Sequence, residues 1–291
     1  MSEATLTFPE ADARKLEPHL PPRPSAQAAS SSSSSSGTQQ DAPLPFVTLT
    51  YATSLDSALA LAPGTQTTLS GPQSKAMTHY LRSRHAAICV GVGTALADDP
   101  GLNCRVATDE GQPPSQPRPI IIDPHQRWAF TEQSKVLQLA RAGRGLAPYI
   151  LIAAAGPEPP AERKRLLEGL GGKYIAIGED SSSSAMEWRD ILRAVKDEGL
   201  GSIMVEGGGQ VISSLLGARN AELIDSVIIT IAPTWLGGGS VFVAPARRLD
   251  AEGNAVAAGR LVNTAWIPLG EDVVLCGKIS KIGPTSSLIA P

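Results

Sequence analysis

A run of three glycines after a short apolar segment is the feature of this sequence that most suggests ligand binding. The segment Val205-Glu206-Gly207-Gly208-Gly209-Gln210 connects a predicted strand over 202–205 with a predicted helix over 210–216. Glycine lets the backbone approach a ligand closely, so that its N–H groups converge on a phosphate. A tight turn accounts for one such glycine, and less easily for three. Glu206 either faces the same ligand or is an exposed loop carboxylate.

A second polar junction follows the apolar segment 86–92. Gly91-Val92-Gly93 is a partial dinucleotide-binding fingerprint, but Leu96 takes the place of its third glycine, so the match is weak evidence. A dense set of polar side chains comes next, namely Thr94, Asp98, Asp99, Asn103 and Arg105. These residues either contact a ligand or form a capped turn, in which Asp98 and Asp99 accept hydrogen bonds from backbone N–H groups.

Two further segments carry side chains suited to binding. Asp56 ends the predicted strand over 46–52 and is either a turn residue or a ligand of a polar heterocycle. The predicted helix over 72–84 carries His79, Arg82 and Arg84 near its end, and His85 follows it. Arginine binds phosphate through two parallel hydrogen bonds, yet basic residues also commonly complement the dipole at a helix C-terminus. The second interpretation is favoured for His79, Arg84 and His85.

Composition excludes several functional classes. The net charge of −3 argues against a general nucleic-acid binder. No apolar run reaches the roughly 20 residues that a membrane helix needs, and no spacing of His, Cys or carboxylates predicts a metal site. Neither a zinc deaminase signature nor a G-x-S-x-G motif is present. Three distant cysteines, Cys89, Cys104 and Cys276, predict buried thiols in a reducing, cytoplasmic setting.

The intervening segments must position these junctions, and they alternate between strand and helix patterns. Short apolar strands are predicted at 46–52, 86–92, 119–122, 149–153, 174–177, 202–205, 227–231 and 273–279, with helices at 72–84, 161–170, 186–198 and 210–216. This pattern predicts one α/β domain with a mostly parallel sheet and helices on both faces. The last two strands lack a helix between them and are expected to pair antiparallel at one edge.

The N-terminal 44 residues differ from the rest. They contain several prolines and the serine run 30–36, and they offer little apolar surface to offset the entropy of ordering. We therefore predict a disordered low-complexity tail over 1–44 and one folded domain over 45–291. Polar stretches at 109–119 and 180–184 are predicted surface loops.

Taken in order, four segments resemble the pyrimidine reductases of riboflavin biosynthesis. They are 52–56 (A-T-S-L-D), 79–82 (H-Y-L-R), 91–105 (G-V-G-T, then D-D-P-G-L and a final R) and 205–208 (V-E-G-G). The resemblance spans about residues 46 to 280, and the segments around 78–82 and 99–104 are most similar to fungal members. One departure is clear: many members continue S-L-D-G-K, whereas Ser57 and Ala58 follow Asp56 here.

The resemblance implies a dihydrofolate-reductase-like fold with a twisted sheet, a homodimer and NADPH as cofactor. It also implies hydride transfer to C1′ of a ring-opened ribosylamino-pyrimidine 5′-phosphate, a small-molecule substrate. By motif, the cofactor contacts are Ala52, Thr68, Thr94, Asp98, Gly207, Gly208, Gly209 and Gln210. The substrate contacts are Arg82, Leu102, Arg105 and Glu206, and the catalytic candidates are Glu206 and Asp56. Asp123 lies near a further cofactor position, with a poor local match.

Several alternatives remain open at this point. Without a deaminase signature and with fungal features, the still-aminated 2,5-diaminopyrimidinone is favoured over the deaminated uracil. A pterin reductase and a non-catalytic NADP-binding module are the other candidates. All reductase interpretations require that the loops ending at Asp56, Arg105 and Gln210 meet around one cleft.

Overall fold

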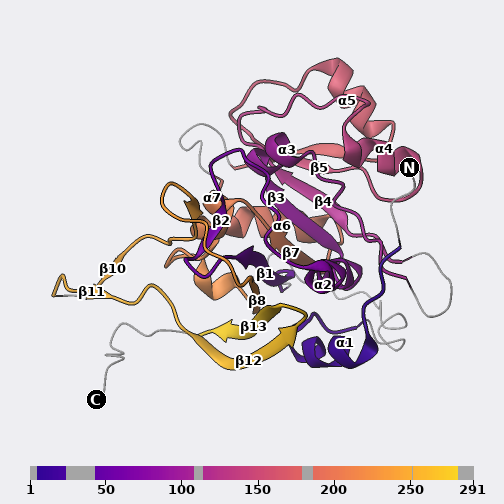
Figure 1. The fold of residues 1–291 in the computed structure, drawn as a ribbon. Helices are drawn as coiled ribbons and strands as arrows, with labels where there is room; N and C mark the ends of the chain where they lie inside the picture. The colour runs from indigo at the N-terminus through magenta and orange to yellow at the C-terminus, as the bar shows by residue number, and fades with distance from the viewer. Residues whose placement is uncertain (1–4, 24–42, 108–113, 179–185, 251, 281–291) are drawn as a thin grey trace, which may run out of the picture.

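A large, mostly parallel sheet forms the centre of the molecule (Figure 1). The computed structural model describes residues 5–23, 43–107, 114–178, 186–250 and 252–280. Within these ranges the sheet has nine strands in the order β12-β13-β8-β1-β7-β3-β4-β5-β6. The seven from β8 to β6 run parallel, whereas β13 is antiparallel to β8 and β12 is antiparallel to β13.

Apart from β12, the sheet strands have bounds close to those of the predicted apolar segments. They are β1 (Phe46–Thr53), β3 (Ala87–Gly91), β4 (Arg118–Ile122), β5 (Tyr149–Ala153), β6 (Lys173–Ile177), β7 (Ser202–Glu206), β8 (Ser226–Ile231), β12 (Leu261–Leu269) and β13 (Asp272–Ile279). The antiparallel pairing of β8 with β13 confirms the expectation for the last two predicted strands. Two smaller sheets pair β2 (Ala58–Ala60) with β9 (Val241–Phe242), and β10 (Arg248–Leu249) with β11 (Ala255–Val256).

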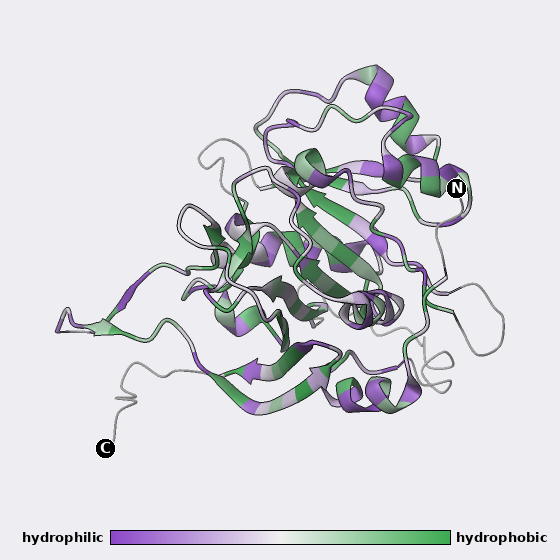
Figure 2. Cartoon of the chain, in the orientation of Figure 1, coloured by the Kyte–Doolittle hydropathy of each residue, from purple (hydrophilic) through white to green (hydrophobic). Residues whose placement is uncertain are grey.

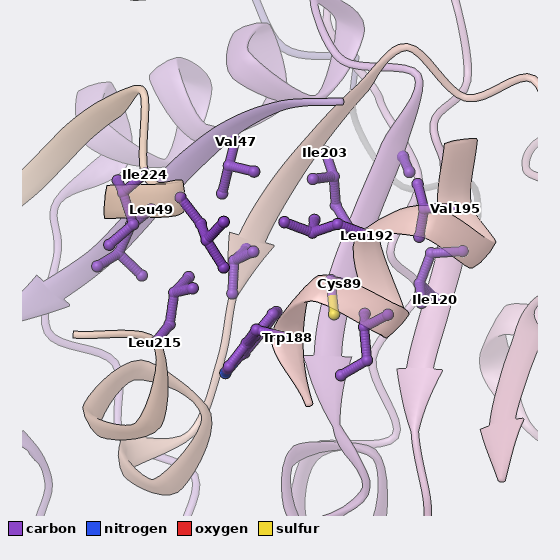
Figure 3. Close-up of a cluster of buried hydrophobic side chains, with 14 of the residues drawn as sticks. Val47, Leu49, Cys89, Ile120, Trp188, Leu192, Val195, Ile203, Leu215 and Ile224 are labelled. Carbon is purple, nitrogen blue, oxygen red and sulfur yellow. The ribbon is translucent and has the colours of Figure 1, made fainter. Parts of the chain in front are cut away.

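Helices cover both faces of the sheet, as predicted. On one face, α6 (Trp188–Asp197) and α7 (Gly209–Leu215) pack against the side chains of β1, β3 and β7. Figure 3 shows Trp188 and Leu192 of α6 near Cys89, in one apolar cluster that also contains Val47 and Leu49 of β1. Figure 2 shows the same division by hydropathy, with apolar strands in the centre. Burying such side chains contributes about 1.5–3 kcal/mol each, so this layer stabilises the sheet.

The opposite face carries two separate apolar clusters. One joins β3, β4 and β5 to α3 (Val92–Asp98), α4 (Lys135–Arg141) and α5 (Ala161–Glu168). The other joins β7, β8 and the β12–β13 hairpin to α2 (Pro72–Ser83) and to the N-terminal residues Leu16 and Leu20. Residues on β7 alternate between faces, so Met204 lies in the second cluster and Glu206 points to the same side.

The N-terminal segment corrects the prediction of a disordered tail over 1–44. Residues 10–16 form α1 (Glu10–Leu16), and a 3₁₀ turn, η1 (Glu17–His19), follows it directly. Leu16 and Leu20 are buried against Met77 and Leu81 of α2. The prediction was wrong here because a few apolar residues are enough to order the segment when they pack against an apolar surface that α2 and the β12–β13 hairpin already form. The serine run and the rest of 24–42 lie outside the described residues, as does the predicted loop 180–184.

Strand β12 and helices α3 and α4 were not predicted. β12 lies at the sheet edge, where Ile267 and Leu269 are its buried residues, so its apolar pattern is weak. Pro268 also argues against a central strand, but an edge strand tolerates proline. The two helices span seven residues each, too short for a periodic signal. None of the helices in the described ranges has the length and apolar character needed to cross a membrane.

Candidate active site

The motif segments gather at one edge of the sheet because their strands run parallel. β1 lies between β7 and β8, and β7 lies between β1 and β3. The register places Thr50 beside Glu206 and Cys89 beside Val205. The segments that follow β1, β3 and β7 therefore leave the sheet at the same end. Ligands of open α/β sheets bind at this carboxyl edge.

Two of the motif glycines are required by close packing in the fold itself. A Cβ atom on Gly91 would lie 2.7 Å from Cγ2 of Val211, and one on Gly207 would lie 2.8 Å from Cβ of Val211. Both distances are far below van der Waals contact. The glycines after β3 and β7 thus allow α7 to pack closely against the strand ends. The sequence interpretation assigned Gly207 to a phosphate and did not detect this role.

The other two glycines lie where separate loops approach each other. A Cβ on Gly208 would lie 3.2 Å from Oγ1 of Thr94, so the β3–α3 junction directly adjoins the β7–α7 junction. A Cβ on Gly209 would lie 3.0 Å from Cγ1 of Val241, and Leu59 is close by. The loop after Asp56, the loop before α3 and the glycine run therefore meet at one place. By contrast, a Cβ on Gly93 would meet no atom within 4 Å, so this position borders open space.

A partly buried ion pair joins the helix motif to the glycine motif. The guanidinium of Arg82 donates to both carboxylate oxygens of Glu206, with Nε–Oε1 at 3.2 Å and Nη2–Oε2 at 2.7 Å. Its Nη1 donates to the backbone carbonyl of Asn103 at 3.1 Å. The two charged side chains are only 14% and 19% exposed. Since an arginine has five N–H donors, these bonds leave two for a ligand.

The side chain of Arg105 lies against His79, which is one turn before Arg82 on α2. The backbone N–H of Arg105 donates to Nδ1 of His79 at 3.2 Å, and Nη2 of the guanidinium lies 3.1 Å from Nε2. Burial, with the positive charges of Arg82 and Arg105, lowers the pKa of His79 to about 3. A neutral imidazole therefore contacts Arg105 and lies within range of the charge of Arg82. Together with Glu206, the site offers cations for a phosphate and a carboxylate for N–H groups of a heterocycle.

Asp56 forms structural hydrogen bonds in this fold. Its carboxylate accepts from the hydroxyl of Ser54 at 2.5 Å and from the backbone N–H groups of Leu236 at 3.1 Å and Gly237 at 2.8 Å. These three hydrogen bonds lower the pKa of Asp56 to about 2. The turn interpretation therefore fits the geometry better than the catalytic one, and Asp56 holds the loop after β8 in place.

The remaining predicted residues lie in different environments. Ala52 is half-buried on the face of β1 that carries Thr50, close to Glu206, and Asp98 ends α3, where burial raises its pKa. Gln210 is exposed in the first turn of α7. Thr68 is exposed before α2, and no hydrogen bond joins it to the other loops in the described ranges. Leu102 is 2% exposed in the apolar cluster, so its side chain does not face the site.

Two other carboxylates are structural as well. Asp99 accepts a hydrogen bond from the backbone N–H of Lys135 at the start of α4, 3.1 Å away. Asp123 is 1% exposed and accepts from the backbone N–H groups of Arg127 and Trp128. Asp99 therefore does accept from a backbone N–H, as the turn interpretation expected, but the donor belongs to α4 and not to its own turn. The carboxylate of Asp123, considered for the cofactor, is instead occupied by a turn.

A cavity of about 250 Å³ lies away from this site, on the face of the sheet that α7 covers. It is lined mainly by apolar side chains, among them Tyr51, Ile229 and Leu261, and by none of the predicted site residues. Among the described residues no cluster of His, Cys, Asp or Glu is arranged to hold a metal ion. We therefore identify the site by the convergence of loops around Glu206 rather than by this cavity.

Comparison with known proteins gives one consistent result. Residues 45–274 match the family model described as the RibD C-terminal domain. A protein of Debaryomyces hansenii named 2,5-diamino-6-ribosylamino-4(3H)-pyrimidinone 5′-phosphate reductase is 41% identical over 237 residues, which cover 81% of this chain and 90% of the relative. The Saccharomyces cerevisiae protein of the same name is 36% identical over 245 residues, or 84% and 91% of the two chains. The solved structure of a riboflavin biosynthesis reductase from S. cerevisiae superposes with a TM-score of 0.66 at 32% identity and covers 92% of this chain and 98% of that one.

Proposed function

This chain belongs to the RibD C-terminal domain family, and from that premise we propose that it is an NADPH-dependent reductase of riboflavin biosynthesis. The substrate is 2,5-diamino-6-ribosylamino-4(3H)-pyrimidinone 5′-phosphate, as in the names of the fungal relatives. The product carries a ribitylamino side chain, formed by reduction of C1′ in the ring-opened imine. The observation that carries the proposal is the meeting of the motif segments around the Arg82–Glu206 ion pair.

A nicotinamide cofactor fits the residues beside Glu206. The hydroxyl of Thr94 adjoins Gly208, and Gly93 borders open space, so backbone and hydroxyl donors can approach a phosphate there. Ala52, at the end of β1, would lie near the nicotinamide side of the same region. Asp98 and the run from Gly207 to Gln210 complete the set, whereas Thr68 has weaker support. NADPH, when bound, supplies the hydride that C1′ receives.

The substrate is held from the other side by opposite charges. Arg105 and the two remaining donors of Arg82 would bind the 5′-phosphate. Glu206, fixed in direction by Arg82, would accept hydrogen bonds from N–H groups of the pyrimidine. Such an acceptor orients the imine for reduction and stabilises positive charge where a proton is taken up. Because the lysine of many relatives is replaced here by Ala58, orientation carries most of this catalysis.

A reduction assay separates this proposal from its alternatives. Purified protein is mixed with NADPH and either the diamino substrate or its deaminated counterpart, and the loss of reduced-nicotinamide absorbance is followed. We expect faster consumption with the diamino compound. A preference for the deaminated compound would identify the uracil reductase instead, and cofactor binding without consumption would identify a non-catalytic module. Consumption with a dihydropterin alone would favour the pterin reductase.

The Glu206→Gln variant tests the proposed role of the carboxylate. We expect turnover to fall by about 10²-fold or more, while the dissociation constant for NADPH changes little. Glu271→Gln, at an exposed hairpin turn, is the matched control and should behave like the wild type. Equal losses in turnover and in NADPH affinity would remove Glu206 from the substrate side of the site.

Assembly and location form the last part of the proposal. Trp266 and Val262 on the edge strand β12 are 61% and 38% exposed, and Leu249 on the β10–β11 hairpin is 60% exposed. Apolar side chains on an edge strand are typical of an interface, so a homodimer is favoured. Sedimentation at several concentrations tests it, and a monomer throughout would contradict it. The three buried free thiols support a cytoplasmic location.

A further inference from the structure

The N-terminal segment, defined as residues 5–23, contacts both parts of the chain that carry the phosphate-binding arginines. Leu6 forms a parallel bridge with Val106. Its N–H donates to the carbonyl of Arg105 at 2.9 Å, and its own carbonyl accepts from the N–H of Ala107 at 2.7 Å. The backbone on both sides of Val106 is therefore fixed by a residue about 100 positions earlier in the sequence.

The same segment also contacts the C-terminal end of α2. Glu17 accepts hydrogen bonds from Tyr80 and Arg84 of this helix, and from Arg23 at 2.9 Å. Although burial raises the pKa of Glu17, these hydrogen bonds outweigh it and lower the value to about 2. Nη2 of Arg84 also donates to the carbonyl of Pro21 at 3.1 Å. Phe8 stacks on Tyr80 with ring centroids 5.2 Å apart.

Near its C-terminus, helix α2 therefore contacts the N-terminal segment on one side and the candidate site on the other. Tyr80 and Arg84 face the N-terminal segment, whereas His79 and Arg82 face the site. In Figure 1, α1 lies below α2 and beside the β12–β13 hairpin, away from the glycine loops. The segment thus contacts the supports of Arg82 and Arg105 without standing in the site itself.

We propose that residues 5–23 act as a brace that positions Arg82 and Arg105 for the 5′-phosphate of the substrate. The inference rests on the proposed function. The positive charges of Arg82 and Arg105 both act on the ring of His79. Because like charges that are brought together repel each other, contacts outside the site help to hold both guanidinium groups toward one phosphate. The brace supplies these contacts at two independent points, the Leu6 bridge for Arg105 and the Glu17 cluster for Arg82.

The Leu6→Pro variant tests the bridge, because proline lacks the N–H that binds the carbonyl of Arg105. We expect the KM for the phosphorylated substrate to rise about tenfold, as for the loss of one good phosphate contact. The KM for NADPH should stay within about twofold, since the glycine loops are untouched. Thr7→Pro, at the neighbouring exposed residue, is the matched control and should leave both values unchanged.

A second variant, Glu17→Gln, tests the other contact and gives the same expected result for the substrate KM. Each variant is also assayed with the dephosphorylated substrate. A positioning role lowers the preference for the phosphorylated form, whereas a merely structural role lowers activity with both forms and the melting temperature together. That outcome, or an unchanged substrate KM in both variants, overturns the brace. If the wild type reduces neither compound, the proposed function fails first, which is a distinguishable result.

Discussion

The free energy of unfolding of this protein should already fall as the pH is lowered from 7.5 to 5, above the range in which carboxylates titrate. His79 and His85 are 4% and 2% exposed. Burial is the largest cause that lowers their pKa values, to about 3 for His79 and about 4 for His85. His85 lies within hydrogen-bond distance of Oγ1 of Thr48, at 2.8 Å, and of the carbonyl of Leu81, at 2.7 Å. Both histidines are therefore neutral in the folded state at neutral pH.

The sign follows from proton binding. As pH falls through 6.5, the ordinary value for histidine, the unfolded chain takes up protons that the folded chain does not bind, so folding stability falls. Each histidine then costs about 1.4 kcal/mol per pH unit. Between pH 7.5 and pH 5 the loss is about 2 kcal/mol per histidine and about 4 kcal/mol for the pair. Such a loss is a large part of a typical folding free energy.

Urea unfolding followed by tryptophan fluorescence measures this loss at constant ionic strength. The His85→Gln variant removes one titrating group and should reduce the fall between pH 7.5 and pH 5 by about 2 kcal/mol. His125→Gln, at an exposed position, is the control and should keep the full fall. A wild-type loss below about 1 kcal/mol would refute the assignment of both rings as buried and neutral.

Three further predictions concern the supports of the site. Gly207→Ala should lower the free energy of unfolding by about 1–3 kcal/mol in urea, because the new Cβ would overlap Val211. Asp272→Ala should cost about 1–2 kcal/mol in the same assay, since the side chain caps α2 by accepting from Gly71 N–H at 2.9 Å and from the hydroxyl of Ser74 at 2.5 Å. Asp56→Ala should speed limited proteolysis of the loop 232–240 and lower kcat/KM while the melting temperature changes little, because its partners are backbone groups of an exposed loop. Unchanged proteolysis would show that the loop is held by other contacts.

The sheet was predictable because each of its parallel strands is a short apolar segment bounded by polar residues. The segment at 149–153 matches β5 at both ends. Prediction failed where a segment gains its apolar contacts from distant parts of the chain. Leu16 and Leu20 look like isolated residues in a proline-rich stretch, yet α2 and the β12–β13 hairpin provide the surface that buries them.

The sequence indicated which segments lie at the carboxyl edge of the sheet, but not the contacts between their side chains. Motif spacing indicated Arg82 and Glu206 separately, but their ion pair spans 124 positions and depends on which side of β7 faces α2. The register of β1 with β7 and the helix placement decide this, and neither is encoded in local spacing. His79 was interpreted as a complement to the helix dipole because its burial against Arg105 was not visible in the sequence.

The glycines show why a sequence motif alone does not distinguish a phosphate-binding glycine from one that packing requires. Gly91 and Gly207 leave room for one side chain, Val211, so a single valine of α7 explains two positions that resemble a phosphate-binding fingerprint. The same close packing brings the turn at Gly208 against Thr94. Packing and binding are therefore linked. Gly91 and Gly207 let α7 approach the strand ends, and because α7 lies so close, Gly208 is placed where it can contact a ligand. A substitution at Gly207 should thus disturb cofactor binding through the position of α7 as well as through the glycine run itself.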